Sequence, residues 1–528
     1  MVQHYLKSMT TINKSGTLLW VDDEIDLLRA HILFLENKGY EVDTVTNGLD
    51  AIESCRNKSY DLILLDEHMM GMSGLETLSH IKDIDPNLPV VMVTKSEEEN
   101  IMDQAIGSKI ADYLIKPVHP NQILLSLKKN IHKRDIVTAE TDRNYRESFA
   151  SLSASINDSM TADDCIVVYR QLVYWELELK EADSSMHDIL TMQKADANAA
   201  FAKFIKRNYM NWMNDRSKSP VMSPDLFRRW VFPALDNNEK IFFIVMDNLR
   251  YDQWRMLSAE LSEYFTFEEE LYYSILPTAT QYSRNAIFSG LMPDQISNMF
   301  PELWVDEDSE EGKNLNEAPL IQTHLDRYRR KNRFSYNKVN DSSAADKLMG
   351  QINNLTGNDL NVIVVNLTDI LSHSKTDSRM MRELANDEAA YRSLILSWFR
   401  HSSIRELFRT IAATGHKVMI TTDHGSISVN NAIRIAGDRT TNTNLRYKVG
   451  KNLGFNPKEV FEINQPAKAF LPSPGISASY IFCTEADYFV YQNNFNNYAS
   501  FYRETFQHGG ISLEEMIIPF AILQSKRR

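Results

Sequence analysis

Five short apolar runs near the start of the chain, each followed by a stretch with the periodicity of an amphipathic helix, limit what this sequence can fold into. They occupy residues 18–21, 42–45, 62–65, 90–93 and 113–115. Strands that alternate with such helices predict a doubly wound parallel sheet. Ligands of these sheets bind at the carboxyl ends of the strands. We therefore predict a (βα)5 domain over residues 15–135, with a site directly after its strands.

The residues at those strand ends form a chemically coherent set. Asp22 and Asp23 follow the first run, Asp66 the third, Thr94 the fourth and Lys116 the fifth. Three carboxylates supply the hard oxygen ligands that Mg²⁺ prefers. A carboxylate can attack a phosphoryl donor when a divalent ion and a lysine neutralise the developing charge. Acidic residues are common at strand ends, but five matched positions in order favour a phosphoryl-accepting site.

This segment resembles the receiver domain of bacterial response regulators. The matching motifs are Val21-Asp-Asp-Glu24, Asp61-Leu-Ile-Leu-Leu-Asp66, Met69-Met-Gly-Met-Ser-Gly74, Val93-Thr94 and Tyr113-Leu-Ile-Lys-Pro117. The resemblance implies that a sensor histidine kinase directs phosphorylation of Asp66. It also implies Mg²⁺ on Asp23 and Asp66, and on Asp22 through a water, with the carbonyl of His68 as a further ligand.

The same resemblance assigns Thr94 and Tyr113 as a switch pair and Lys116 as a contact of the phosphoryl group. Receivers usually pair through the surface around their fourth helix, fifth strand and fifth helix, so we expect phosphorylation to favour a homodimer. One position departs from the family, because Met70 stands where a proline is usual. This departure concerns the loop and leaves the reacting groups in place.

The next segment, residues 136–222, has a helical pattern. Thr161 and Asp164 are spaced as a capping box. Apolar side chains then trace helix faces at Ile166, Tyr169, Val173 and Leu177, and at Phe201, Phe204, Ile205, Tyr209 and Trp212. Such aromatic stripes are far more often core than binding surface. We predict a helical bundle linker, and the absence of a basic recognition helix argues against a DNA-binding output.

A second α/β pattern begins after two Ser-Pro pairs. Continuous apolar runs at residues 240–246, 361–367 and 417–421 are typical of parallel strands that are buried on both faces. They predict a second, larger α/β domain over residues 236–528.

Each of these runs is followed by residues that bind metals. Asp247 follows the first, Asp369 and His373 follow the second with i, i+4 spacing, and Asp423-His424 follow the third; His508 stands near the end. Together they suit a two-metal phosphoryl-transfer site. We divide the ligands into one set of Asp369, His373 and His508, and a second set of Asp247, Asp423, His424 and the Thr280 hydroxyl. Nitrogen and oxygen ligands without thiolate favour zinc, with manganese as the alternative.

The stretch of residues 276–290 indicates which reaction such metals would support. Its pattern predicts a helix that begins at Thr280, whose free N–H groups and dipole suit a phosphate. Arg284 lies on the same face and can hold a phosphate oxygen. Metal coordination would lower the pKa of the Thr280 hydroxyl and make it a nucleophile. The alternative is an ordinary helix start beside a solvated arginine.

Residues 240–520 resemble the PglZ branch of the alkaline phosphatase superfamily. The matching elements are Asp247, Pro277-Thr-Ala-Thr280 with Arg284 and Gly290, Asp369-x-x-x-His373, Asp423-His424-Gly425, and His508-Gly-Gly510 with Glu514, Glu515 and Pro519. The resemblance implies an alkaline-phosphatase-like domain. Asn248 stands where relatives often have glycine, which concerns the loop after the first strand and removes no ligand.

The order of receiver, helical linker and PglZ domain is similar to that of PorX-type response regulators of the type IX secretion system. That resemblance implies a zinc-dependent phosphodiesterase with a phospho-threonine intermediate, acting on cyclic or linear nucleotides or short oligonucleotides. It also implies regulation of type IX protein secretion, with a cytoplasmic secretion component or a sigma factor as possible partners.

Five basic residues after His424 suggest where such a substrate would bind. They are Arg434, Arg439, Arg446, Lys448 and Lys451, with Tyr447 between them and Tyr480 and Phe482 further on. A basic strip with aromatic side chains can hold a short single strand. The alternative is an exposed loop with ordinary surface charge.

Composition limits the remaining classes. The formal net charge of −14 disfavours a protein that binds DNA over its whole surface. The three cysteines have no metal-type spacing and indicate a reducing compartment. The apolar runs are too short to cross a bilayer, and the first residues lack the apolar core of a signal peptide. We therefore expect a cytoplasmic protein.

Two other functions fit the same residues. One is a phosphomonoesterase or phosphomutase that uses the same metals. The other is a non-enzymatic, phosphorylation-dependent assembly switch whose metals are structural. Thr280 argues against the switch, because a structural zinc site needs no nucleophile.

Overall fold

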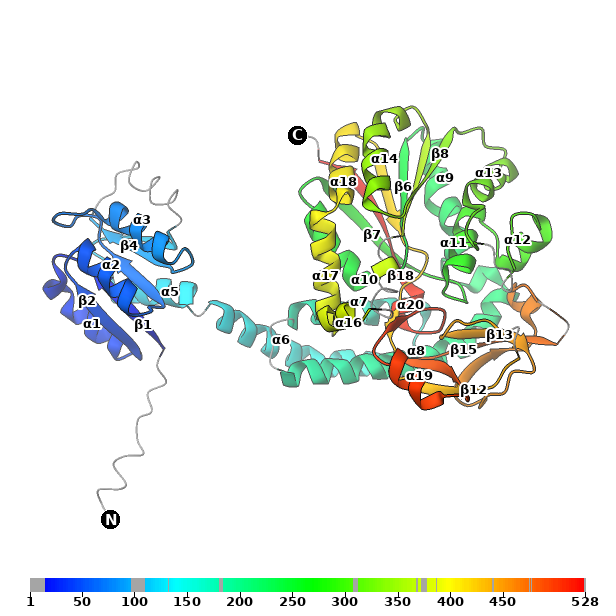
Figure 1. Cartoon of the computed structure of the whole chain (residues 1–528), viewed down its shortest axis with the longest axis horizontal. Helices are drawn as coiled ribbons and strands as arrows, with labels where there is room; N and C mark the ends of the chain where they lie inside the picture. The colour runs from blue at the N-terminus through cyan, green and yellow to red at the C-terminus, as the bar shows by residue number, and fades with distance from the viewer. Residues whose placement is uncertain are drawn as a thin grey trace, which may run out of the picture. The chain divides into compact units, whose positions relative to one another are not determined.

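In the computed structural model the chain forms two compact units, Met1–Arg143 and Asn144–Arg528 (Figure 1). The structure describes residues 15–95, 110–131, 133–179, 184–306, 312–366, 369–371, 378–385, 387–438, 441–473, 475 and 477–526. No helix within these residues is both long and apolar enough to cross a membrane.

The first unit is the predicted doubly wound sheet. Its parallel strands are β1 (Gly16–Val21), β2 (Tyr40–Val45), β3 (Leu62–Leu65), β4 (Val90–Thr94) and β5 (Asp112–Ile115), in the order β2-β1-β3-β4-β5. Its helices include α1 (Arg29–Glu36), α2 (Gly48–Asn57), α3 (Gly74–Ile84) and α5 (Pro120–Ile131). One apolar core forms against α2 and α3, and another against α1 and α5, so both faces of the sheet are covered. This confirms the predicted fold of the segment.

The second unit is built on a larger mixed sheet. Its strands are β6 (Ile241–Met246), β7 (Phe265–Tyr273), β8 (Phe334–Val339), β9 (Leu360–Val365), β10 (Lys417–Thr421) and β18 (Ile517–Ser525), in the order β7-β18-β10-β6-β9-β8. Strands β10, β6, β9 and β8 are parallel, whereas β18 is antiparallel to both of its neighbours. All six side chains of β6 are buried, as its unbroken apolar sequence predicts.

Helices cover both faces of this sheet (Figure 1). One group contains α10 (Tyr251–Leu261), α14 (Ser342–Leu355), α17 (Glu388–His401) and α18 (Ser403–Thr414). The other contains α9 (Phe232–Asp236), α11 (Thr280–Ser289), α12 (Pro293–Met299) and α13 (Glu317–Arg327). A short helix, α16 (Arg379–Leu384), precedes α17. The predicted second, larger α/β domain is therefore confirmed.

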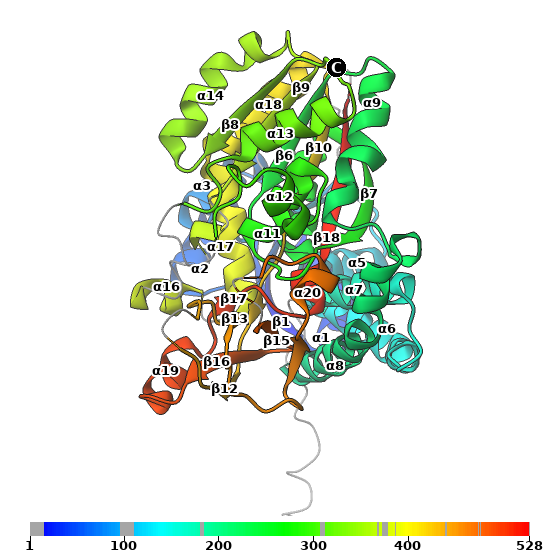
Figure 2. The ribbon, with the colours of Figure 1, turned by 90° about the vertical axis from the view of Figure 1, so that its right-hand side faces the viewer.

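Small strands are inserted between β10 and β18, in the region that contains the predicted basic strip. They are β11 (Ile427–Ser428), β12 (Asn431–Ile435), β13 (Tyr447–Lys451), β14 (Val460–Ile463), β15 (Ala478–Cys483), β16 (Asp487–Tyr491) and β17 (Phe506–Gln507). They pair as β13-β15-β14, β12-β16 and β11-β17, and α19 (Phe495–Tyr502) and α20 (Leu513–Met516) complete the insertion. Figure 2 shows these strands gathered near α20.

The linker helices are α6 (Lys133–Ser155), α7 (Ala162–Glu178) and α8 (Ser184–Asn214). Thr161 and Asp164 form the predicted capping box at the start of α7. The apolar faces of α7 and α8 share one continuous core with the large sheet. Tyr209 of α8 accepts a hydrogen bond of 2.9 Å from the backbone N–H of Leu276, and Tyr273 donates one of 2.8 Å to the carbonyl of Ala162. Helices α7 and α8 are thus an integral layer of the second unit.

Candidate functional site

The predicted receiver site forms at the carboxyl ends of β1, β3 and β5. Ligand oxygens of Asp22, Asp23 and Asp66 all lie within 4.8 Å of one another. The Nζ atom of Lys116 lies 2.6 Å from Oδ2 of Asp22 and 2.7 Å from Oδ2 of Asp66. Burial raises the pKa of Asp22, and its bond with Lys116 opposes that rise. Clustered carboxylates are the donor set that Mg²⁺ prefers, so these residues fit the expected ion.

The other predicted receiver residues lie nearby. Thr94 ends β4, its side chain is buried, and its Oγ1 atom lies 3.3 Å from Nδ1 of His68. Tyr113 is half-buried in β5. Met70 is 87% exposed in the loop after β3, so the side chain that replaces the usual proline does not pack into the site. The switch roles of Thr94 and Tyr113 stay predictions.

In the second unit, the loops after β6 and β10 bring together the predicted metal set of Asp247, Asp423, His424 and Thr280. Ligand atoms of Asp247, Asp423 and His424 lie within 4.8 Å of one another. Thr280 is the first residue of α11, as predicted. Its Oγ1 atom lies 3.4 Å from Oδ1 of Asp247 and 3.1 Å from Nε2 of His424. The hydroxyl therefore stands beside a carboxylate and an imidazole at a helix N-terminus.

Two members of the other predicted set, of Asp369, His373 and His508, lie next to it. The Nε2 atom of His508 is 3.9 Å from Oδ1 of Asp369, and the rings of His508 and His424 stack with their centroids 4.2 Å apart. Asn248 donates a hydrogen bond of 3.2 Å from its side chain to Asp369. His373 lies outside the described residues, so its part in this set stays a prediction.

Backbone carbonyls orient the two imidazoles. The Nδ1 atom of His424 lies 3.1 Å from the carbonyl oxygen of Gly425, and Nδ1 of His508 lies 3.1 Å from that of Thr278. An Nδ1–H donated to a carbonyl leaves the lone pair on Nε2, which is the atom that can then bind a metal. Two Nε2 atoms and several carboxylates in one place suit zinc or manganese. The residues present therefore fit a divalent metal centre.

Arg284 lies deeper than the sequence suggested. It is 1% exposed, and its Nη2 atom lies 2.5 Å from Oδ2 of Asp247 and 2.9 Å from Oδ2 of Asp423. Burial raises the pKa of Asp247 well above its usual value even beside this arginine. For Asp423, the same burial is outweighed by Arg284 and His424, which lower its pKa. The alternative of a solvated arginine is wrong, and its predicted contact with a phosphate oxygen stays a prediction.

Sequence reasoning missed two partners of this guanidinium. Its Nη1 atom lies 3.3 Å from Oε1 of Glu317, at the start of α13, and 3.2 Å from Oδ1 of Asn366. Asn366 directly follows the apolar run of β9, which was a usable signal. Glu317 stands in no recognisable motif, and only the tertiary fold brings it here.

The backbone conformation at position 248 shows how asparagine can stand where relatives often have glycine. The backbone of Asn248 has a φ of +58°, in the left-handed region that glycine enters freely and asparagine tolerates better than most residues. Its N–H also lies 3.3 Å from Oδ1 of Asp423. The loop keeps the required conformation without glycine.

The predicted basic strip is wrong as a continuous exposed surface. Arg446 is fully buried and forms a two-point ion pair with Glu515, with distances of 3.1 and 2.6 Å. Lys448 is 1% exposed, its Nζ atom donates to the carbonyl of Asn442, and burial lowers its pKa to about 8. Tyr447, Tyr480 and Phe482 are buried as well.

The other three residues of the predicted strip are Arg434, Lys451 and Arg439. Arg434 and Lys451 are exposed, and Arg434 stacks over the ring of Phe495 at 4.5 Å. Arg439 lies outside the described residues. Of the five predicted contacts, only these three remain as substrate-binding predictions.

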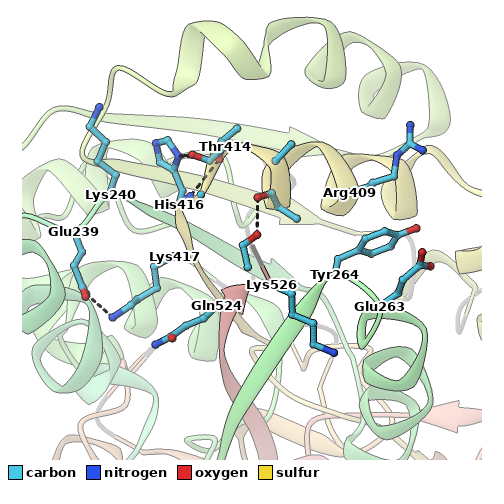
Figure 3. Close-up of a pocket in the computed structure, with 14 residues that line it drawn as sticks. Glu239, Lys240, Glu263, Tyr264, Arg409, Thr414, His416, Lys417, Gln524 and Lys526 are labelled. Carbon is cyan, nitrogen blue, oxygen red and sulfur yellow. Dashed lines mark hydrogen bonds and ion pairs between the residues drawn. The ribbon is translucent and has the colours of Figure 1, made fainter. Parts of the chain in front are cut away.

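A large cavity lies elsewhere in the unit. It has a volume of about 1130 Å³ and lies at the amino ends of β6 and β10, opposite the strand ends that carry Asp247 and Asp423 (Figure 3). Lys417 pairs with Glu239 at 2.5 Å, Lys240 donates to the carbonyl of Thr356 and Lys526 to that of Ser262. Because these ammonium groups already have partners, we do not regard the cavity as the candidate functional site.

Comparison with known proteins gives three family matches. A BREX system PglZ alkaline phosphatase-like domain matches residues 226–523, more than half of the chain. A PorX response regulator linker domain matches residues 135–213, and a response regulator receiver domain matches residues 18–128. Fold and site thus define a two-component response regulator with a phosphatase-like output unit. The chain belongs to the family of PglZ alkaline phosphatase-like proteins, and its three matches follow a PorX-type order.

Curated relatives match a short part of the chain. The chain is 38% identical over 112 residues to the transcriptional regulatory protein ZraR of Klebsiella oxytoca, across 21% of this chain and 25% of that protein. It is 37% identical over 113 residues to a CpxR homolog of Haemophilus influenzae, across 21% of this chain and 48% of that protein. It thus spans a quarter to about half of these relatives.

Solved receiver domains are similar as well. A CheY-like receiver domain protein from Methanospirillum hungatei JF-1 is 26% identical with a TM-score of 0.22, covering 22% of this chain and 94% of that one.

Proposed function

We propose that this response regulator is a phosphorylation-controlled, zinc-dependent phosphodiesterase that hydrolyses cyclic or linear nucleotides or short oligonucleotides. The observation that carries the proposal is the position of the Thr280 hydroxyl at the N-terminus of α11, 3.4 Å from Asp247 and 3.1 Å from His424. A threonine there has the geometry of a nucleophile.

The proposed metal ligands form two sets. Asp247, Asp423 and His424 would hold one metal ion, and Asp369, His373 and His508 the other. Bound ions supply Lewis-acid stabilisation of the phosphoryl oxygens and lower the pKa of coordinated hydroxyl groups.

The reaction proceeds in two displacements. The Oγ1 atom of Thr280 gives its proton to water and bonds to phosphorus, while the bond from phosphorus to the leaving oxygen breaks and that oxygen takes a proton from water. The resulting phospho-threonine still carries the retained part of the diester. The N-terminus of α11 stabilises the phosphoryl group through its N–H groups. Water then attacks the phospho-threonine, which restores Thr280 and releases a phosphomonoester from a diester substrate.

Control would come from the receiver unit. A sensor kinase directs phosphorylation of Asp66, the phosphoryl group recruits the Thr94 hydroxyl, and Tyr113 turns inward. We infer that this change favours a homodimer, in keeping with the PorX-type order, and links the enzyme to type IX secretion through a secretion component or a sigma factor. Light scattering with a beryllofluoride mimic tests the dimer, and an unchanged mass with the mimic bound would rule it out.

A substrate panel tests the activity itself. The zinc-loaded full chain is given a linear dinucleotide, a cyclic dinucleotide, a short oligonucleotide and a simple phosphomonoester. We expect faster turnover of the diesters, and loss of that turnover in Thr280→Val but not in Thr266→Val, which alters an exposed threonine of β7. Faster monoester hydrolysis would indicate a phosphomonoesterase instead, and no hydrolysis at all would favour an assembly switch.

A further inference from the structure

A charge network of buried and partly buried side chains lies behind the candidate site and joins it to the linker helices. Its acidic members are Glu176, Asp252, Glu388 and Glu514, and its basic members are Lys194, Arg250 and Arg392. Glu176 comes from α7 and Lys194 from α8, whereas the other members come from α10, α17, α20 and the loop after β6. We call these seven residues the linker network.

The distances show a connected set. The Nζ atom of Lys194 lies 2.8 Å from Glu176 and 3.6 Å from Glu514. Arg250 lies 2.5 Å from Asp252 and 2.9 Å from Glu388. Carboxylates of Glu176, Asp252 and Glu388 are close enough to share a metal ion, but the cations between them already neutralise them. The cluster is therefore an ion-pair network and not a third metal site.

Asn198 of α8 extends the network to α20. This buried side chain accepts a hydrogen bond of 2.8 Å from the N–H of Leu513 and donates one of 3.0 Å to Glu514. Leu513 and Glu514 lie a few residues after His508, and the N–H of Gly510 donates to Glu515 at 2.9 Å. The segment that carries His508 is thus attached to the linker helix α8.

The same short helix touches the loop that carries His424. The N–H of Gly425 donates to the carbonyl of Glu515 at 3.2 Å. A Cβ atom at Gly425 would lie 2.0 Å from the carbonyl oxygen of Glu514, so the two backbones are in direct contact. Moving α20 would therefore move both imidazoles of the candidate site.

A purely stabilising role does not account for this arrangement. Replacing buried ion pairs by well-packed apolar residues is often neutral or stabilising, so such networks are weak evidence for stability. They do fix geometry, because each charge is satisfied in only one arrangement. Residues that orient metal ligands from behind typically affect metal affinity or activity by about 10–100-fold.

We propose that α7 and α8 are part of the catalytic unit, with Lys194 and Asn198 as positioning residues that hold His508 and His424 in place through α20. This inference rests on the proposed function of the site. It also gives the linker a direct means of changing turnover, because a small shift of α8 reaches both imidazoles without any change in the sheet.

The test uses the full chain with Lys194→Met and Asn198→Leu. Lys203→Met is the matched control, since Lys203 is also on α8 but is exposed and pairs with Asp158 at 3.3 Å. We expect the two variants to raise the dissociation constant for zinc about tenfold in competition with a chelator, and to lower kcat for a diester about tenfold or more with little change in KM. Lys203→Met should leave all three unchanged.

Hydrogen exchange supplies a readout that does not depend on turnover. In Asn198→Leu, amides of residues 508–516 should lose protection while those of β6 do not. The proposal would be overturned if both variants were folded and had the same zinc affinity, kcat and local protection as Lys203→Met. Loss of protection throughout the unit would also overturn it, because the network would then only stabilise the fold. A parent chain that binds zinc but hydrolyses no diester would refute the proposed function alone, because zinc affinity and exchange still test the positioning.

Discussion

Replacing Arg284 with methionine should destabilise the metal-free protein strongly and the zinc-loaded protein much less. The guanidinium lies 2.5 Å from Asp247, 2.9 Å from Asp423 and 3.3 Å from Glu317, and it is 1% exposed. Methionine keeps most of the volume but removes the charge. In the metal-free site, the variant leaves buried carboxylates without this cation.

The expected magnitude follows from that burial. Breaking a buried ion pair by removing one partner costs about 3–5 kcal/mol. With zinc bound to Asp247 and Asp423, the metal supplies the missing positive charge. The remaining loss concerns Glu317 and Asn366, at about 1–3 kcal/mol for hydrogen-bond partners left unsatisfied.

Urea unfolding, followed by circular dichroism with and without saturating zinc, measures both values. The control is Arg400→Met, because Arg400 is 50% exposed and pairs with Glu260 at 2.7 Å. An exposed pair of this kind contributes about 0–1 kcal/mol. If Arg284→Met lost no more than the control, or lost the same amount with and without zinc, the reasoning about charge compensation would be refuted.

Three further predictions concern separate parts of the chain. Asp66→Ala should abolish the uptake of phosphate from a small phosphodonor with Mg²⁺, and equal labelling by mass spectrometry would contradict the receiver assignment. Gly290→Ala should cost more than the about 1–2 kcal/mol of a left-handed alanine, because its Cβ would lie 2.3 Å from His324, whereas Gly415→Ala, also left-handed but in open space, should cost only that amount in urea unfolding. Burial lowers the pKa of His324 to about 3, so the unfolded state takes up its proton first and stability should fall as pH drops from about 6.5 toward 3. An equally steep pH dependence in His324→Gln would exclude His324 as the cause.

The sequence was most informative where the chemistry is local. Asp247 directly follows β6, Asp423 lies two residues after β10, and Thr280 begins α11, so strand and helix ends placed each of them correctly. The receiver cluster was predictable for the same reason. In a parallel sheet, residues that follow neighbouring strands must meet at one edge.

Burial of charged residues was not predictable. The sequence predicted Arg446 and Lys448 to be part of an exposed basic strip. It does not show that Glu515 neutralises Arg446 or that the insertion covers Lys448. Glu317 joins the site from a helix with no motif. Lys194 and Glu514 meet only after the linker helices have docked on the sheet. Such pairs form between residues that are distant in sequence, so local sequence patterns do not predict them.

Trapping the covalent intermediate tests the central claim most directly. The zinc-loaded full chain is mixed with a diester substrate and quenched in acid during turnover, and the peptide that contains Thr280 is analysed by mass spectrometry. The account predicts a fraction of Thr280 whose phosphoryl group still carries the retained part of the diester; it appears with substrate, disappears when substrate is exhausted and is absent from Thr280→Val. Sustained diester hydrolysis by Thr280→Val at the parental rate would contradict it.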